Sequence, residues 1–303
     1  MMSTPSSFPL EAIPDIEAAP EDYRLLQRIP ITRSGTSFPI ELNPPVGDER
    51  LFVVVDVETT GLNPSADKII ELGLVRGTFS PSEERITSIL EAHSRFEDPG
   101  IPIPKLITDI TGITDQDVAG KHIDDAWLAM MIQGDPLLIA HNAEFDRQFM
   151  DSRFPACEKQ IWACTLTEVD WKKLGYEGRK LEYLLSKHGY FYQGHRAAVD
   201  CLATAWLMHC QPEAFPLLLA SARQKTFVVR AFGAPFDVKD TLKSRGYRWH
   251  GGDQANNKCW WTVVTETNLQ AEQEFLNKAY PNGAQLAQYQ PQTARTRFKG
   301  ENM

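Results

Sequence analysis

Three strand-like segments follow one another closely between residues 51 and 96, which restricts the chain to a sheet-based fold. Leu51 to Glu58 is an apolar, valine-rich run that ends in acidic residues. The runs 68–79 and 85–96 are also rich in apolar and β-branched residues and are bounded by Pro, Ser or Asp. Because short turns separate the three segments, they predict an antiparallel meander.

The pattern changes after Pro104 to alternating helical and extended segments. We expect helices over 124–133, 144–153, 181–188 and 197–210, and strands over 136–140 and 161–165. A meander that is followed by alternating elements predicts an α/β fold, with a mixed sheet covered by helices.

Three further segments are expected to lie outside this fold, two at the N-terminal end of the chain and one at the C-terminal end. Residues 1–22 are rich in Pro, Ser, Ala and acidic residues without periodicity, so we expect a disordered tail there. Residues 23–50 form a lead-in segment. The Gln-, Ala- and Thr-rich residues 283–303 predict a disordered C-terminal tail.

A domain boundary is expected at Pro212 and Pro216, which would end a first domain over 51–211. Residues 222–282 then read as a small α+β domain. Its expected elements are a strand over 225–232, a helix over 235–246, a strand over 259–264 and a helix over 269–280.

Composition limits the class of protein. The chain has 303 residues and 42% hydrophobic content, which is enough for a large domain with a smaller one. Its apolar runs are shorter than the ~20 residues of a membrane span, so we expect a soluble, cytoplasmic protein with no membrane partner. The five cysteines show no paired CxxC spacing, and they suggest neither a disulfide framework nor a zinc site.

The net charge of −9 is unevenly distributed along the chain. From Ser221 onward there are 12 Lys and Arg residues against 7 Asp and Glu, whereas the preceding part has 19 against 33. A bound divalent cation can offset acidity at a functional site. The basic excess of the C-terminal part is a separate feature, and charge runs of this size are usually a solvated face.

Asp56 and Glu58 are the first candidate functional residues. Side chains at i and i+2 of a strand share a face, so the two carboxylates point the same way. They repel each other unless a cation lies between them, and their hard oxygen ligands suit Mg²⁺ or Mn²⁺. The alternative is a solvated strand end without function.

Three more candidates follow along the chain. Asp146 lies in the first turns of an expected helix, where its carboxylate could face a crevice at the edge of the sheet. The alternative is that Asn142 caps this helix and Asp146 merely complements the helix dipole. His195 precedes another helix, and Asp200 lies about one turn further on. A histidine with a pKa near ~6.5 can accept a proton from water at neutral pH.

The strings VVVDVETTGL, HNAEFD and HRAAVD occur in this order across residues 51–210. They resemble the three motifs of the DEDDh, or DnaQ-like, 3′–5′ exonucleases, which include the proofreading subunit of bacterial DNA polymerase III and RNase T. The string GIT at 112–114 also falls where the family often has it. The tyrosine branch of the superfamily has tyrosine at the position of Arg196, so the histidine branch is favoured.

The resemblance implies an RNase H-like fold with a mixed five-stranded sheet flanked by helices, and a site with two divalent cations, Mg²⁺ or Mn²⁺. By this resemblance Asp56, Glu58 and Asp200 hold the first ion, and Asp56 also reaches the second. Asp146 supports the second ion through water, and His195 is the general base.

The resemblance also implies a pocket for the terminal nucleotide. Its lining would be Thr59, Thr60, Gly61 and Leu62, with Gly61 allowing close backbone approach and Leu62 wedging against a base. Asn142 and Phe145 are weaker candidates for this pocket. The alternative is that Asn142 caps a helix and that Phe145 is an aromatic residue of the core.

The segment from Phe236 to Trp261 resembles small repeats that accompany DNA- and RNA-processing domains. Tyr247, Trp249, Trp260 and Trp261 alternate there with basic residues, a pattern that suits single-stranded nucleic acid. The alternative is that the tryptophans form the domain core, which we expect for Trp249 and Trp260.

Together these features predict a metal-dependent 3′–5′ exonuclease that releases nucleoside 5′-monophosphates, with DNA favoured over RNA and a possible role in proofreading or repair. Its expected partners are single-stranded 3′ ends and a DNA polymerase or other replication protein. The alternative is a nucleic-acid-binding or polymerase-associated adaptor whose nuclease site is vestigial.

Overall fold

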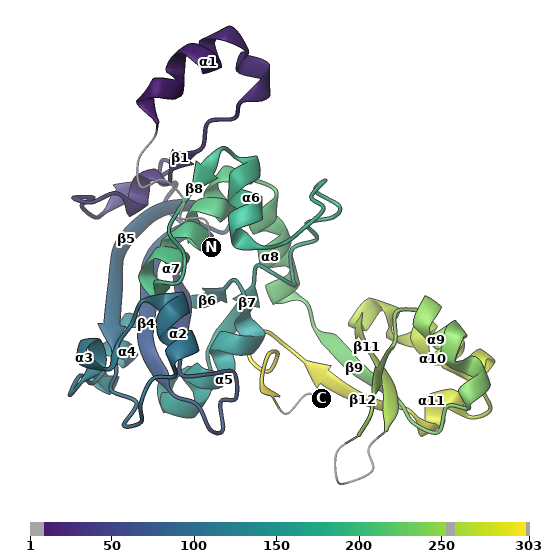
Figure 1. Ribbon diagram of the computed structural model, residues 1–303. Helices are drawn as coiled ribbons and strands as arrows, with labels where there is room; N and C mark the ends of the chain where they lie inside the picture. Colours follow the sequence, from purple (N-terminus) through teal and green to yellow (C-terminus); the bar gives the residue numbers. More distant parts are fainter. Residues whose placement is uncertain (1–8, 253–257, 301–303) are drawn as a thin grey trace.

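A six-stranded mixed sheet forms the centre of the larger lobe in the computed structural model, which describes residues 9–252 and 258–300 (Figure 1). The strand order is β2-β5-β4-β3-β6-β7; the neighbouring pairs β2–β5, β5–β4 and β4–β3 are each antiparallel, and β6 and β7 run parallel to β3. The strands are β2 (Ile40–Glu41), β3 (Arg50–Thr59), β4 (Ile69–Ser80), β5 (Arg85–Phe96), β6 (Leu137–Ala140) and β7 (Ile161–Cys164).

The five expected strands are confirmed, and β2 adds a sixth at the edge of the sheet. Its two residues pair with Ile89 and Ser88 of β5. A strand of this length leaves no periodic pattern in the sequence, so it could not be predicted from local composition.

Both faces of the sheet are covered by helices. Phe52 and Val54 of β3 pack with α6, α7 and α8 in one core, whereas Val53 and Val55 pack with α4 and α5 in the other. This burial on both sides explains why the strand is continuously apolar. The helices are α2 (Lys105–Thr111), α3 (Asp115–Val118), α4 (Asp125–Met131), α5 (Ala143–Arg153), α6 (Leu181–Lys187), α7 (Ala197–Cys210) and α8 (Ala214–Arg223). Among the described residues, no helix is long and apolar enough to cross a lipid bilayer.

The lead-in segment is part of the larger lobe. Ile29 and Ile31 are buried in the same core as α7. Just before them, β1 (Gln27–Arg28) pairs in parallel with β8 (Tyr190–Phe191). This pairing places the lead-in beside the segment that carries His195.

The expected N-terminal tail is wrong for residues 10–22. They form α1 (Ile13–Ala18) between two turns of 3₁₀ helix, although none of their side chains is buried. Figure 1 shows α1 standing away from the sheet. Residues 1–8 of the expected tail lie outside the described residues.

The expected boundary at Pro212 and Pro216 is also wrong, because α8 belongs to the larger lobe. Phe215, Leu218 and Leu219 of this helix are buried in the core that α7 shares. Pro216 is tolerated because it lies in the first helical turn, where a backbone N–H has no partner within the helix. The larger lobe therefore extends to Arg223.

The smaller lobe is a four-stranded antiparallel sheet of order β10-β11-β9-β12, with helices packed on one face. Trp260 is buried in its core, as expected, but Trp249 is 54% exposed and was wrongly expected there. The elements are β9 (Thr226–Ala231), α9 (Lys239–Ser244), β10 (Arg248–His250), β11 (Cys259–Thr265), α10 (Leu269–Ala279), α11 (Gly283–Leu286) and β12 (Gln288–Gln292).

The expected C-terminal tail over 283–303 is wrong for its described part. α11 and β12 complete the smaller lobe, and residues 293–300, which we call the C-terminal strap, return to the larger lobe (Figure 1). The polar composition gave no sign of this packing, because the strap is held by hydrogen bonds and ion pairs. Residues 301–303 lie outside the described residues.

Arg147 of α5 anchors the C-terminal strap. Its guanidinium is fully buried and donates to the backbone carbonyls of Ala294, Arg295 and Arg297. It also forms an ion pair with Asp151, with 3.1 Å between Nε and Oδ2. One buried cation therefore satisfies carbonyl groups of a segment that has little apolar surface of its own.

We predict that Arg147→Met will lower the free energy of unfolding by about 3–5 kcal/mol, because Asp151 and the strap carbonyls lose their buried donor. Urea unfolding measures this loss, with Arg24→Met as a control at an exposed arginine. A loss below about 1 kcal/mol would show that the strap does not depend on Arg147.

Candidate active site

Asp56 and Glu58 lie on one side of β3, near its C-terminal end. In the neighbouring strand β4, Gly73 lies opposite Asp56 and Glu71 lies opposite Glu58. The two-residue period of the strand gives both carboxylates the same direction, as the sequence predicted. Their position in a central strand of the sheet holds their backbone rigidly.

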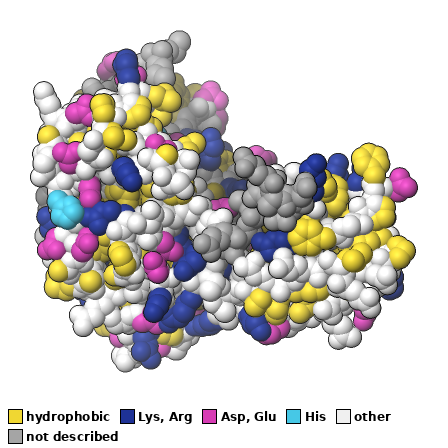
Figure 2. Space-filling view, turned by 90° about the horizontal axis from the view of Figure 1, so that it is seen from below, with side chains coloured by type: hydrophobic (Ala, Val, Ile, Leu, Met, Phe, Trp, Pro, Cys, Tyr) yellow, Lys and Arg dark blue, Asp and Glu magenta, His cyan; other side chains and the backbone are white. Residues whose placement is uncertain are grey.

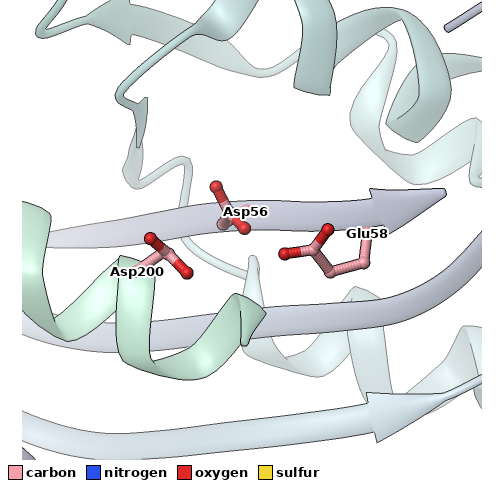
Figure 3. Close-up of side chains that lie close together, drawn as sticks. All are labelled: Asp56, Glu58 and Asp200. Atoms are coloured by element: carbon pink, nitrogen blue, oxygen red, sulfur yellow. The ribbon is translucent and has the colours of Figure 1, made fainter. Parts of the chain in front are cut away.

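Asp200 joins these two carboxylates from α7. Asp56, Glu58 and Asp200 each have a carboxylate oxygen within 4.8 Å of such oxygens of the other two. Figure 3 shows Asp56 and Glu58 on the strand, with Asp200 reaching toward them from the helix. This spacing is suitable for holding a cation between hard oxygen ligands.

Asp146 lies beside this cluster, in the first turn of α5. Its side chain is buried, and Oδ1 accepts a hydrogen bond of 3.0 Å from the backbone N–H of Val57. Val57 lies between the two acidic residues of β3, so this hydrogen bond ties α5 to the carboxylate-bearing part of the strand. The structure thus brings all four predicted carboxylates to one region.

Burial and mutual repulsion favour protonation of these groups in the absence of a cation. Burial, and then repulsion from Asp146 and Asp200, raises the pKa of Asp56 well above its usual range. Burial chiefly raises the pKa of Glu58 to about 8, that of Asp146 to about 7 and that of Asp200 to about 6. Neighbouring carboxylates add to the shift at Glu58 and Asp146.

Asp200 is oriented by donors from the segment that precedes α7. The backbone N–H of Arg196 donates to its Oδ2 over 3.1 Å, and the hydroxyl of Tyr192 donates to the same carboxylate. His195 lies in this segment with φ of +64°, a left-handed conformation that is uncommon outside glycine. Its side chain is exposed, next to a carboxylate whose position is well defined.

Glu71 holds the start of α7 against the sheet. Its fully buried carboxylate accepts hydrogen bonds from the guanidinium of Arg196, with Nε to Oε2 at 3.2 Å, and from the backbone N–H of Ala197. Ser94 Oγ donates to its other oxygen over 2.5 Å. Arg196, which follows His195 in sequence, is thus fixed to Glu71, which lies opposite Glu58 in the sheet.

Gly73 makes this docking sterically possible. A Cβ atom at this position would lie 2.1 Å from the carbonyl carbon of Ala197 and 2.4 Å from the backbone nitrogen of Ala198. Only glycine allows the helix backbone to approach the strand so closely. Glu71 and Gly73, the partners of Glu58 and Asp56 across the sheet, therefore both position α7.

The predicted nucleotide-binding residues after β3 form a tight turn. Thr59 and Thr60 are buried, and the hydroxyl of Thr60 donates to Asp67 Oδ1 over 3.1 Å. A Cβ atom at Gly61 would lie 2.5 Å from the same carboxylate, so a larger residue there would displace the Asp67 side chain from its hydrogen bond with Thr60. Leu62 is 83% exposed at the tip, where it is free to contact a ligand.

Asn142 and Phe145 are placed differently from each other. Asn142 stands at the N-cap position of α5 but makes no side-chain capping hydrogen bond, and its side chain is exposed. Phe145 is partly buried and packs against Phe149, with 4.9 Å between ring centroids. The core-aromatic alternative thus describes Phe145, whereas the capping alternative does not describe Asn142.

Sequence reasoning missed Glu71 and Tyr192. Glu71 had a detectable signal, since a glutamate inside the apolar string IIELGL must find a partner when the strand is buried. Tyr192 had no such signal, because it lies in a loop and its contact with Asp200 depends on how that loop returns to the sheet.

The helix-covered mixed sheet and the carboxylate cluster define a nuclease with an RNase H-like fold. Residues 53–208, about half of the chain, match the RNase_T family model, which is described as "Exonuclease". The chain belongs to this exonuclease family.

Curated relatives are similar over the same region. The chain is 32% identical over 167 residues to "DNA polymerase III PolC-type" of Listeria innocua, and 31% identical over 202 residues to the protein of that name from Clostridium perfringens. These alignments cover 53% and 63% of the chain. The chain spans only 11% and 13% of the relatives' own lengths.

Among solved structures, exonuclease X in complex with 5′-overhanging duplex DNA aligns with a TM-score of 0.41 and 24% identity, over 56% of this chain and 92% of that chain. The zinc-bound E. coli ExoI–ssDNA complex aligns with a TM-score of 0.46 and 18% identity, over 84% of this chain and 66% of that chain.

We predict that the metal-free protein loses stability as pH rises from 6.5 to 8.5. The folded state keeps protons on Asp146 and Glu58 up to pKa values of about 7 and 8, whereas the unfolded chain releases them near pH 4. The folded state binds more protons in this window, so the free energy of unfolding falls by up to about 1.4 kcal/mol per pH unit for each such proton.

Urea unfolding in EDTA at the two pH values tests this, and Mg²⁺ should reduce the difference because a bound cation favours the ionised carboxylates. The variant Asp146→Asn/Glu58→Gln should show a much flatter dependence. A metal-free protein that becomes more stable across this window would contradict the raised pKa values.

We also predict energetic coupling between Glu71 and Arg196. Arg196→Ala should lower the free energy of unfolding by about 2–3 kcal/mol, because a buried carboxylate loses its charged donor. The loss should be smaller in the Glu71→Gln background, with a coupling above about 1 kcal/mol in a double-mutant cycle. The exposed pair Lys105 and Asp109 serves as a control, with an expected coupling below about 0.5 kcal/mol.

Proposed function

We propose that the protein is a metal-dependent 3′–5′ exonuclease of the DEDDh type, which hydrolyses phosphodiester bonds and releases nucleoside 5′-monophosphates. The single observation that carries this proposal is the convergence of Asp56, Glu58 and Asp200. Family membership supports it, because the cluster lies within the matched region.

The residues fit divalent cations by their chemistry. Oxygen ligands without a Cys or His cluster suit Mg²⁺ or Mn²⁺, and the burial and mutual repulsion that raise the pKa values of Asp56 and Glu58 support the binding of a cation between them. Asp56, Glu58 and Asp200 would bind one ion directly, and Asp56 would also reach a second. Asp146 would support the second ion through water. The pair of cations would supply the positive charge that stabilises the attacking and leaving oxygens.

His195 would act as the general base. Its exposed side chain can approach a water molecule beside the carboxylates, while Glu71 and Arg196 hold the backbone of its segment in place. The imidazole would accept the proton of the attacking water. Asp200, held by backbone and Tyr192 donors, would stay fixed while His195 moves.

The substrate would be the 3′ end of a nucleic acid, with DNA favoured over RNA. This preference is supported by the similarity to PolC-type DNA polymerase III. The turn from Thr59 to Leu62, together with Asn142 and the exposed part of Phe145, would receive the terminal nucleotide. A role in proofreading or repair, with a DNA polymerase as partner, is part of the same proposal. A vestigial site in an adaptor protein is disfavoured, because all four carboxylates are retained.

The proposal predicts stepwise shortening of a 5′-labelled single-stranded oligonucleotide from its 3′ end, which EDTA stops. Asp56→Asn should abolish the activity, because it removes the carboxylate that would contact both ions. Asp109→Asn, at an exposed aspartate of α2, should retain it. Cleavage by folded Asp56→Asn at the wild-type rate would contradict the assignment, and parallel RNA and duplex substrates would establish the preferred nucleic acid.

The role of His195 has its own test. His195→Ala should lower kcat by about 10²–10⁴-fold, as is typical for loss of a general base, while the affinity for Mn²⁺ stays near the wild-type value. Single-turnover cleavage and Mn²⁺ titration measure the two quantities. A wild-type rate at saturating metal would make His195 a structural residue.

A further inference from the structure

A continuous row of aromatic rings and lysines crosses the smaller lobe. We define the aromatic–lysine stripe by its five residues. Phe236 lies just before α9, and Lys239 and Lys243 lie in this helix. Trp249 lies in β10 and Trp260 lies in β11.

Close contacts connect the members of the stripe. The rings of Trp249 and Trp260 lie 5.3 Å apart, and Lys243 Nζ lies 6.0 Å from the Trp260 ring. Lys239 lies one helical turn before Lys243, so the two lysines share a face of α9. Its Nζ lies 3.9 Å above the Phe236 ring. The order along the stripe is therefore two rings, two cations and a third ring.

The stripe is accessible to a ligand at Phe236, Lys243 and Trp249, whereas Trp260 is buried in the core of the smaller lobe. Phe236 is 76% exposed and Trp249 is 54% exposed, although both are large aromatic residues that a small lobe could have used in its core. Lys243 is exposed as well. Neither lysine has a carboxylate partner among the described residues, so their charge remains available.

We propose that the aromatic–lysine stripe binds single-stranded nucleic acid. The exposed ring of Trp249 offers a stacking surface for an unpaired base, and Phe236 offers a second one at the other end. The lysines between them contact the phosphates of the same strand. Paired bases cannot stack on a side chain in this way, so the surface selects single strands over duplex.

The chemistry of the aromatic–lysine stripe favours single-stranded nucleic acid over a protein partner. A purely apolar partner would leave the two lysines without compensation, whereas a phosphodiester chain matches both the charge and the rings. Figure 2 shows hydrophobic side chains gathered on the smaller lobe, on the right, with lysines and arginines beside them. The proposal is independent of catalysis, because binding at the stripe requires neither the carboxylates nor a cation.

Binding of a labelled oligothymidylate in EDTA, measured by fluorescence anisotropy, tests the proposal without cleavage. Trp249→Ala should weaken binding about 5- to 150-fold, which corresponds to the loss of one stacked base. Trp249→Phe should restore most of the affinity. Leu286→Ala, which removes a 50% exposed apolar side chain from α11, should bind as the wild type does.

The salt dependence of binding tests the contribution of the two lysines separately. Lys239→Ala and Lys243→Ala should each reduce the slope of log K against log salt concentration by about 0.7, as expected for one phosphate contact with a single strand. Lys278→Ala serves as the matched control, because it removes the same charge from the last turn of α10. An equal effect of all three variants would show that only net charge matters, and would overturn the proposal.

Two further ligands make the test specific. An abasic oligonucleotide and a duplex of the same length should both bind more weakly than the single strand, and Trp249→Ala should bind the abasic strand as well as the wild type does. Equal affinity of the wild type for all three ligands would overturn the proposal. If Trp249→Ala abolishes dimerisation in ultracentrifugation and leaves oligonucleotide affinity unchanged, the stripe is an interface with a second copy instead.

Discussion

Mutual repulsion among four clustered carboxyl groups, one buried (Asp146) and three partly buried (Asp56, Glu58 and Asp200), is the constraint on which the arrangement around the site depends. Two unit charges 4 Å apart interact by about 4 kcal/mol at an effective dielectric constant near 20, so the group cannot ionise fully without compensation. The fold supplies part of this compensation through two hydrogen bonds, from the backbone N–H of Val57 to Asp146 and from the backbone N–H of Arg196 to Asp200. The Val57 donor lies on the strand that carries Asp56 and Glu58, so it fixes α5 to β3, whereas the Arg196 donor orients Asp200 at the start of its own helix.

The parts of the site that could be predicted from sequence are those set by local geometry. Asp56 and Glu58 share a face because a strand has a period of two, and α7 begins and ends where its composition indicates. The contact between Glu71 and Arg196 spans 125 residues and exists only after α7 docks on β4. Its existence depends on the tertiary fold, so no local pattern contains it.

The same distinction explains the errors in domain organisation. Proline was interpreted as a boundary, yet Pro216 lies in the first turn of α8, where it breaks no hydrogen bond. The Gln- and Thr-rich C-terminal region lacks the apolar content of a core segment, yet its carbonyls are bound by Arg147 from the other lobe. A segment whose partners are polar and distant in sequence resembles a disordered tail when only composition is read.

The uneven charge of the chain bears on how a strand would reach the site. The first 220 residues are strongly acidic, whereas the remainder is basic. At physiological ionic strength charges are screened over about 8 Å, so basic residues of the smaller lobe cannot attract a strand to a distant site through solvent. They can contribute only by contacting the strand itself, and the C-terminal strap then matters because it connects the two lobes a second time. The smaller lobe, which carries the aromatic–lysine stripe, is joined to the larger lobe by the chain that leaves α8 and by the strap that Arg147 anchors, so Arg147 contributes to holding the two lobes together.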